Sequence, residues 1–160
     1  MATKYENLHF NGILDSGDRH EFSTGAVRDM REGKGRCDLM PLYVVSQLMN
    51  RYRQSAVLSF IAIFMEDKNT THLYGALHEF ASLAYNGSAD TMILEVAKHF
   101  EEGAKKYGEH NWQKGIPMNC YIDSAVRHYL KWCRGDREEP HDRAFVWNLL
   151  CCIWEVDWHD

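Results

Sequence analysis

The chain of 160 residues lacks any apolar run long enough to cross a membrane. Its longest run, 56–65, has about half of the roughly 20 residues that a transmembrane helix needs, and Ser59 interrupts it. The sequence also does not open with a charged-then-apolar leader. We therefore exclude a membrane protein and expect a soluble protein of the cytoplasm.

Three further signals are missing. The net charge of −5 is the opposite of the basic excess that proteins binding long nucleic acids carry. The five cysteines are odd in number and show no CxxC spacing, so we expect reduced thiols packed in helices. No GxxxxGK[ST] motif is present, which excludes a Walker A loop.

The apolar residues recur every three to four positions along most of the chain, which predicts an all-α protein. We expect one domain, 1–160, built as a bundle of about five helices, and we identify no strand and no internal repeat. Residues 1–40 hold five glycines among many charges and should form an irregular Gly/Arg-rich segment. The expected helices cover about 41–65, 70–84, 88–107, 119–134 and 140–156.

Local signals set these bounds. Pro41 suits a first helical turn, and Ser88 suits a capping position. Thr70 or Thr71 and Asn119 are further candidate caps. Gly108 and Gly135 can end helices because glycine adopts positive φ without strain.

Carboxylates on two consecutive helices are the candidate metal ligands. Glu101 and Glu102 lie on the third helix and Asp123 on the fourth, and facing helices of a bundle can hold Mg²⁺ or Mn²⁺ in this way. Glu102 and Asp123 are also the candidate catalytic residues. The alternative is that Glu101 pairs with Lys105 and Asp123 with Arg127, one turn apart on the same helix.

Cations and amides supply candidate contacts to a nucleotide. Lys34 and Arg36, with Arg28 and Arg31 nearby, could wrap a polyphosphate, although Asp29, Glu32 and Asp38 could instead balance a solvated loop. An amide among apolar neighbours needs a partner or a ligand. The full set of candidate substrate-binding residues is Lys34, Arg36, Lys106, Asn111, Trp112, Arg127, His128 and Asn148.

A second constellation offers a different chemistry. His99, the His141-Asp142 pair and Asp157 occur in the H…HD…D order of metal-dependent HD phosphohydrolases. That order is easily obtained by chance in a chain with nine histidines.

Several short motifs in one order resemble a phage-encoded family of dATP/dGTP diphosphohydrolases. They are GAVRD at 25–29, GKGRCDLMP at 33–41, GAKKYGEHNW at 103–112, DSAVRH at 123–128 and WN at 147–148. The resemblance covers 24–41 and 95–156, and the helical segment 42–94 looks like an insertion. The family is related in activity to MazG-like all-α pyrophosphohydrolases.

The resemblance implies a metal-dependent enzyme that converts purine deoxynucleoside triphosphates to monophosphate and pyrophosphate with Mg²⁺ or Mn²⁺. It further implies a homo-oligomer, a dimer or tetramer, in the cytoplasm of a bacterial or infected host cell. The chain departs from the MazG-like EExxE pattern, because Lys105 follows Glu101-Glu102 at the last position. That departure favours the alternative, a non-catalytic phage protein that binds a nucleotide or a host protein.

Overall fold

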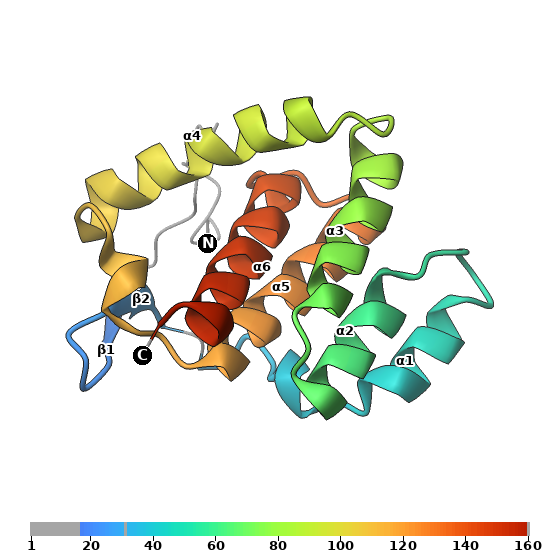
Figure 1. Ribbon diagram of the computed structural model, residues 1–160, viewed down its shortest axis with the longest axis horizontal. Helices are drawn as coiled ribbons and strands as arrows, with labels where there is room; N and C mark the ends of the chain where they lie inside the picture. The colour runs from blue at the N-terminus through green and yellow to red at the C-terminus, as the bar shows by residue number, and fades with distance from the viewer. Residues whose placement is uncertain (1–16, 31, 160) are drawn as a thin grey trace, which may run out of the picture.

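The computed structural model describes residues 17–30 and 32–159, so Gly12 and Arg31 lie outside the described residues. The prediction of an all-α protein is confirmed, with six helices in the described part (Figure 1). The elements are β1 (Arg19–Glu21), β2 (Val27–Asp29), the 3₁₀ turns η1 (Cys37–Leu39) and η2 (Asn111–Lys114), and the helices α1 (Leu42–Met49), α2 (Val57–Asp67), α3 (Thr71–Ala84), α4 (Ala89–Tyr107), α5 (Met118–Arg134) and α6 (His141–Asp157).

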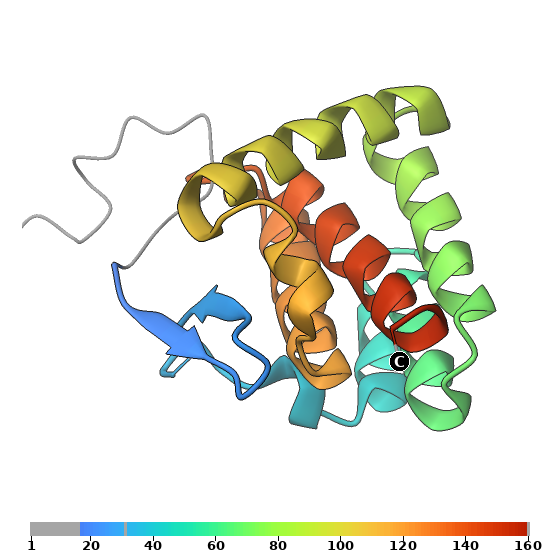
Figure 2. The same cartoon turned by 60° about the vertical axis from the view of Figure 1, so that its left-hand side comes forward.

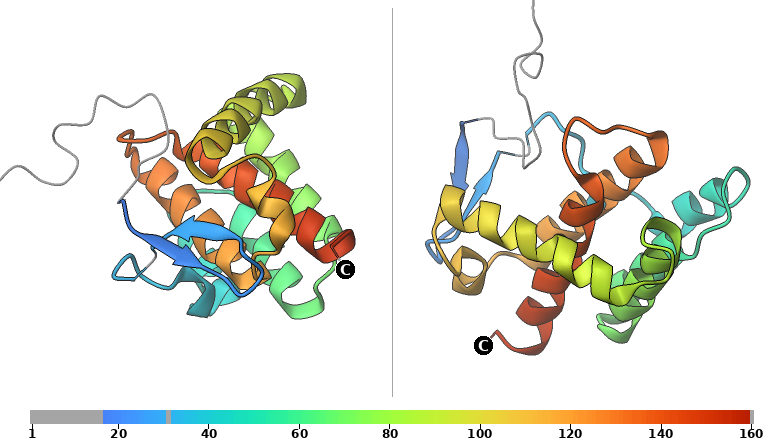
Figure 3. Two further views of the ribbon diagram at one scale, coloured as in Figure 1. Left: turned by 90° about the vertical axis from the view of Figure 1, so that its left-hand side faces the viewer. Right: turned by 90° about the horizontal axis from the view of Figure 1, so that it is seen from above.

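Helix α6 lies at the centre of the molecule. It packs along α5 and also contacts α4 and α3, while α1 and α2 lie beyond α3 at one end (Figure 1). The two strands and η2 lie at the opposite end, near the start of α5 (Figure 2). Seen from above, α4 crosses over the central pair of helices (Figure 3). This arrangement leaves one end of α5 and α6 facing the two strands.

A group of aromatic rings holds the central helices together. Phe80 of α3 is fully buried and packs edge-on or tilted against Tyr129 and Trp132 of α5 and Phe145 of α6. Each buried aromatic side chain of this size contributes roughly 1.5–3 kcal/mol through removal of apolar area from water. His141, Phe145, Asn148 and Cys152, which recur every three to four positions along α6, are all nearly inaccessible.

Four predicted helices are confirmed to within two residues, and their ends show why. The Ser88 side chain accepts a hydrogen bond from the Thr91 amide, as expected of a cap. Gly108 and Gly135 end α4 and α5 with positive φ. Thr70 occupies the capping position before α3, as predicted, but its side chain makes no capping hydrogen bond, and the predicted cap at Asn119 is wrong. Thr70 donates its hydroxyl to Asp157, and Asn119 lies inside α5.

The predicted helix over 41–65 is wrong, because the chain breaks into α1 and α2 at residues 50–56. Ser55 causes the second start: its hydroxyl oxygen accepts a hydrogen bond from the Val57 amide and another from the Tyr129 hydroxyl. Arg53 also turns back to donate to the carbonyl oxygen of Cys133 on α5. These polar contacts compete with a continuous helix.

The prediction that the chain has no strands is also wrong. β1 and β2 pair antiparallel, with Arg19 opposite Asp29 and Glu21 opposite Val27. A turn over 22–26 joins them, and Gly25 there has a φ of +85°. Strands of three residues carry too little alternation to be recognised in a sequence, and contacts from η2 stabilise them.

The expectation about the cysteines is confirmed, since all five are free. Cys120, Cys151 and Cys152 are buried within helices, and burial raises the pKa of Cys152 to about 12. No helix of the described residues is both long and apolar enough to cross a membrane.

Candidate functional site

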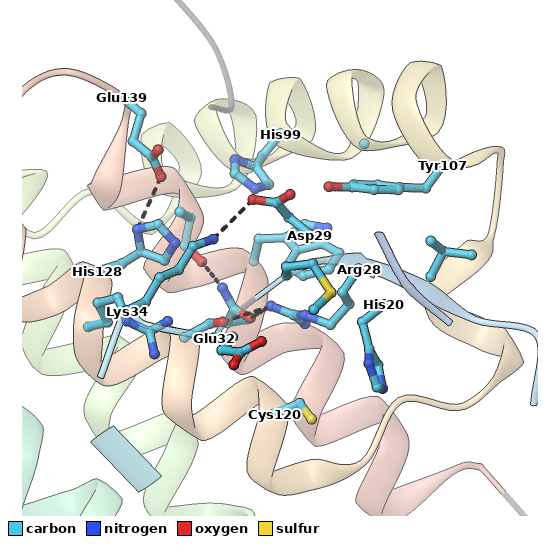
Figure 4. Close-up of a pocket in the computed structure, with 18 of the residues that line it drawn as sticks. His20, Arg28, Asp29, Glu32, Lys34, His99, Tyr107, Cys120, His128 and Glu139 are labelled. Carbon is cyan, nitrogen blue, oxygen red and sulfur yellow. Dashed lines mark hydrogen bonds and ion pairs between the residues drawn. The ribbon is translucent and has the colours of Figure 1, made fainter. Parts of the chain in front are cut away.

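A cavity of about 690 Å³ lies between the β1–β2 hairpin, residues 30 and 32–36, the C-terminal half of α4, most of the length of α5 and the N-terminal half of α6. Its wall includes segments from both ends of the sequence, from His20 to Asn148 (Figure 4). The volume falls in the range of pockets that hold a small molecule or a nucleotide. Five cations and three carboxylates line it, namely Arg28, Lys34, Arg36, Arg127 and Lys131 against Asp29, Glu32 and Glu139.

Arg28 of β2 extends from the hairpin onto the helical floor of the cavity. Its Nη2 donates to the Ser124 hydroxyl at 2.9 Å and to Asn148 Oδ1 at 3.0 Å. The guanidinium also lies over the rings of Tyr121 and Trp147, at 5.2 and 5.6 Å. Its other terminal nitrogen, Nη1, is buried without a hydrogen-bond partner among the described residues. A buried cationic donor without a partner is costly unless an anion meets it.

Asn148 holds that arginine in place. Its amide nitrogen donates to the Ala144 carbonyl oxygen one turn earlier on α6, which turns Oδ1 toward Arg28. Both polar ends of this buried amide are therefore satisfied, as the sequence requires of a polar residue in an apolar helix.

Lys34 and Arg36 lie at the edge of the cavity, each beside a carboxylate. Lys34 Nζ is 3.0 Å from Asp29 Oδ2, and Arg36 donates to both carboxylate oxygens of Asp38. Their side chains are 38% and 40% exposed. An anionic ligand would have to compete with these carboxylates for either cation.

Arg127 and Asp123 join the 34–37 loop to α5. Arg127 Nη2 contacts Asp123 Oδ2 at 2.7 Å and also donates to the carbonyl oxygen of Gly35. The other oxygen of Asp123, Oδ1, accepts a hydrogen bond of 2.6 Å from the Cys37 amide. Asp123 is completely buried, so this pair fixes the loop that carries Lys34 and Arg36.

Asn111 of η2 fixes the hairpin in a similar way. Its side chain accepts a hydrogen bond from the Val27 amide and donates one to the Val27 carbonyl oxygen, as a neighbouring strand would. Thr24 in the hairpin turn also donates its hydroxyl to the carbonyl oxygen of Gly115. The hairpin is thereby attached to the helical body.

Aromatic side chains form a less polar part of the wall. Trp147 of α6 lies 5.6 Å from the ring of His99 on α4, and Tyr107 and Phe22 also line the cavity. His99 is 6% exposed, and its Nδ1 has no hydrogen-bond partner among the described residues. Burial, together with the nearby Arg143, lowers the pKa of His99 to about 3, so that its ring is neutral at pH 7.

Two imidazoles and a carboxylate converge at the other end of the cavity. His128 Nδ1 lies 2.9 Å from His141 Nδ1 and 3.4 Å from Glu139 Oε1 (Figure 4). Burial lowers the pKa of both histidines, that of His128 most strongly. His128 and Glu139 face the cavity, and His141 lies behind them.

A comparison with protein families decides the relationship of the chain. The family model for the N-terminal domain of dATP/dGTP diphosphohydrolases matches residues 78–159. The chain belongs to this family. No curated protein and no solved structure matches it significantly. The matched region contains α4, η2, α5 and α6, and therefore most of the helical wall of the cavity in this dATP/dGTP diphosphohydrolase family member.

Six of the eight predicted substrate-binding residues line the cavity, which brings together positions distant in the sequence: Lys34, Arg36, Asn111, Arg127, His128 and Asn148. Lys106 and Trp112 do not line it. Trp112 packs against Phe100 of α4 and Trp154 of α6. Three of the six also form side-chain hydrogen bonds with other groups of the protein and so help to shape the cavity: Asn111, Asn148 and Arg127.

The three predicted metal ligands do not form one cluster. Glu101 is 68% exposed and 3.7 Å from Lys105, and Asp123 binds Arg127, as the alternative interpretation expected of both. Glu102 is partly buried and 3.7 Å from Arg143. Within the described residues, the groups of three candidate ligand side chains that do converge are His128, Glu139 and His141, and Asp136, Glu138 and His141.

The HD constellation does not assemble on this fold. His141 and Asp142 open α6 and Asp157 ends it, sixteen positions later, which places them about 24 Å apart along the helix. Asp142 accepts a hydrogen bond from Tyr85, and Asp157 accepts one from Thr70. One metal cannot bridge the two ends of a helix of this length.

The predicted site residues do not include several that line the cavity, above all Arg28, His99, Tyr107, Glu139 and Trp147. Arg28 and Trp147 stand within the motifs that carry the family resemblance. In the sequence, nothing distinguishes Arg28 from the other arginines or Trp147 from the other tryptophans. The two residues come together only because the hairpin lies over α5 and α6.

Proposed function

We propose that the protein is a metal-dependent pyrophosphohydrolase that converts purine deoxynucleoside triphosphates, dATP and dGTP, to monophosphate and pyrophosphate. Membership of the dATP/dGTP diphosphohydrolase family supports the substrate and the reaction. The single observation that carries the proposal is Arg28, which lines a cavity rich in cations and whose buried Nη1 has no partner among the described residues. We propose that the protein acts on this substrate in the cytoplasm.

The triphosphate is the part of the substrate that this cavity suits best. Arg28 offers a desolvated donor, and guanidinium groups bind phosphate oxygens more strongly than neutral donors do. Lys34, Arg36 and Lys131 lie around it at the wall. Lys34 and Arg36 are themselves partly exposed, and a phosphate would reach either cation by competing with its carboxylate partner, Asp29 or Asp38.

The purine and sugar would lie against the aromatic part of the wall. Trp147 and Tyr107 offer flat faces on which a base can stack, and the unpartnered His99 Nδ1 offers a polar atom at the same side. A neutral His99 is able to accept or donate one hydrogen bond without adding charge. This division places phosphates and base at separate parts of one cavity.

The proposed reaction is attack of water on the α-phosphorus. A bond forms from the water oxygen to phosphorus, and the bond to the bridging oxygen breaks, so pyrophosphate leaves. Negative charge grows on that leaving group, and the role of Arg28 is to offset it. The residues Lys34, Arg36 and Arg127 hold and surround the phosphates from the loop side.

A divalent metal, Mg²⁺ or Mn²⁺, is part of the proposal. Glu101 and Asp123 do not fit a shared ion as they stand, since one is exposed beside Lys105 and the other is satisfied by Arg127 and Cys37. We therefore derive no step from these carboxylates. Glu102 stays a predicted ligand and catalytic residue, and unchanged metal-dependent turnover in Glu102→Gln would remove it from the mechanism.

The direct test is incubation of the purified protein with a panel of dNTPs and NTPs. Each reaction is run with Mg²⁺, with Mn²⁺ and with chelator, and the products are separated by chromatography. We expect dAMP or dGMP with an equal amount of pyrophosphate, and none of either with chelator. Nucleoside plus triphosphate, or diphosphate plus phosphate, would contradict the proposed reaction.

The second candidate is a non-catalytic phage protein that binds a nucleotide or a host protein. The observation that favours it is the dispersal of the three predicted carboxylate ligands. Calorimetry with dGTP distinguishes the two, because saturable binding with no product after long incubation supports the binding protein. Release of pyrophosphate by the same preparation supports the first candidate, the enzyme.

We further propose a homo-oligomer, a dimer or tetramer. Tyr43, Val44 and Leu48 on α1 leave much of their apolar surface exposed, which supports association. Light scattering after size-exclusion chromatography gives the mass, and a monomer at micromolar concentration would contradict this part of the proposal.

A further inference from the structure

We propose that His128, Glu139 and His141 bind a single transition-metal ion of the Zn²⁺ class, with one coordination position open to the cavity. The three ligand atoms are His128 Nδ1, His141 Nδ1 and Glu139 Oε1, which lie within 4.8 Å of one another. The proposal that this ion binds is independent of the proposed reaction. Only the role of its open position rests on the proposed function.

The spacing of the three atoms fits one ion. They are separated by 2.9, 3.4 and 3.8 Å. Two ligand atoms at about 2.1 Å from a common ion are about 3.0–3.4 Å apart at right or tetrahedral angles. Two Nδ1 atoms facing each other at 2.9 Å otherwise share a single proton, which the ion would replace.

A neighbouring carboxylate sets the state of one ligand. His141 Nε2 lies 2.9 Å from Glu138 Oε1, so Nε2 carries the proton and donates a hydrogen bond to the Glu138 carboxylate. The Nδ1 of His141 is then left with a lone pair, and that lone pair faces His128 and Glu139. Carboxylates that hold the second nitrogen of a ligand histidine in this way are regular partners of metal sites.

The surroundings leave the ion one route to solvent. The side chains of His141, Glu139 and His128 are 0%, 10% and 18% exposed, and only the last two face the cavity. A site with three protein ligands and an open side is the arrangement of catalytic rather than structural zinc sites. A phosphate oxygen of the proposed substrate would reach the open position from the cavity.

The donor set selects the kind of ion. Two imidazole nitrogens and one carboxylate suit Zn²⁺ or Co²⁺, whereas Mg²⁺ and Ca²⁺ take oxygen ligands almost throughout. The site is therefore distinct from the carboxylate set Glu101, Glu102 and Asp123 in both position and preference.

The test is calorimetric titration of the chelator-treated full chain with Zn²⁺, without nucleotide, on wild type and four variants. We expect one ion per chain in wild type. His128→Gln and Glu139→Gln should lose at least about 100-fold in affinity, and Glu138→Gln about tenfold, since it only orients His141. His72→Gln, at a partly exposed histidine paired with Asp67, is the matched control and should bind as wild type does.

Two further measurements keep the test decisive if a variant folds poorly. Circular dichroism checks each variant, and X-ray absorption on Zn²⁺-loaded wild type should show two imidazole ligands and at least one oxygen. Absence of saturable binding in wild type, or equal affinity in His128→Gln, Glu139→Gln and the control, would overturn the proposal. Binding without dNTP hydrolysis would overturn only the proposed function.

Discussion

Arg28 is the residue on which the cavity depends most. Its Nη2 is held by Ser124 and Asn148, and its guanidinium rests on the faces of Tyr121 and Trp147. These contacts fix its orientation without a ligand, so the proposed binding of a phosphate would cost little conformational entropy at this side chain.

Asp123 has a structural role, because both of its carboxylate oxygens bond to other groups of the protein. Replacing it by asparagine keeps an acceptor for the Cys37 amide but leaves the 10%-exposed Arg127 without its counter-charge. We expect Asp123→Asn to lower the free energy of unfolding by about 3 kcal/mol in urea titrations. The matched change Glu101→Gln, at an exposed pair, should leave stability nearly unchanged. Equal stabilities for the two variants would contradict this role for Asp123.

His99 predicts how stability depends on pH. Its pKa is lowered from an ordinary value near 6.5 to about 3. Between these two pH values the imidazole of His99 is therefore protonated in the unfolded chain but neutral in the folded protein. Stability is therefore lost as the pH falls from 6.5 toward 3, by up to about 1.4 kcal/mol per pH unit from this residue. Between pH 6.5 and 5.0, the free energy of unfolding should fall by about 2 kcal/mol more in wild type than in His99→Gln. Parallel curves would show that His99 is not the group responsible.

At the scale of elements, the hairpin is the part of the site most easily displaced. Two hydrogen bonds between Asn111 and Val27, one donated by each residue, attach β2, which carries Arg28, to the helical body. Asn111→Ala removes both, and we expect a loss of about 1–3 kcal/mol in stability. Because Arg28 moves with β2, the KM for dGTP should rise more than kcat falls. A KM equal to that of wild type would show that the hairpin stays in place without Asn111.

The helices themselves were largely predictable from the sequence. Stripes such as Leu73, Leu77 and Phe80 repeat at three and four positions, and Ser88 and Gly108 mark where α4 begins and ends. The break between α1 and α2 was not, because it depends on Tyr129 reaching Ser55 from 74 positions away. The strands were missed for the same reason, since η2 supplies the contacts that hold them.

At the scale of the whole molecule, the site is a product of tertiary packing. Six predicted substrate residues line one cavity, because their motifs lie on segments that meet there. Carboxylate roles were harder to predict, since Asp123 and Asp29 look alike in a sequence until their cation partners are known. Glu139 and His141 gave no local metal motif with His128, which lies eleven residues before Glu139 on another element.

The measurement that tests the account most directly is kcat/KM for dGTP in Arg28→Gln beside Arg53→Gln. Arg53 is an exposed arginine that donates to Cys133 and does not line the cavity. Losing one charge-assisted contact should lower kcat/KM by about 10- to 100-fold in Arg28→Gln, while Arg53→Gln stays close to wild type. If both variants turn over dGTP as wild type does, the cavity beside Arg28 is not the triphosphate site.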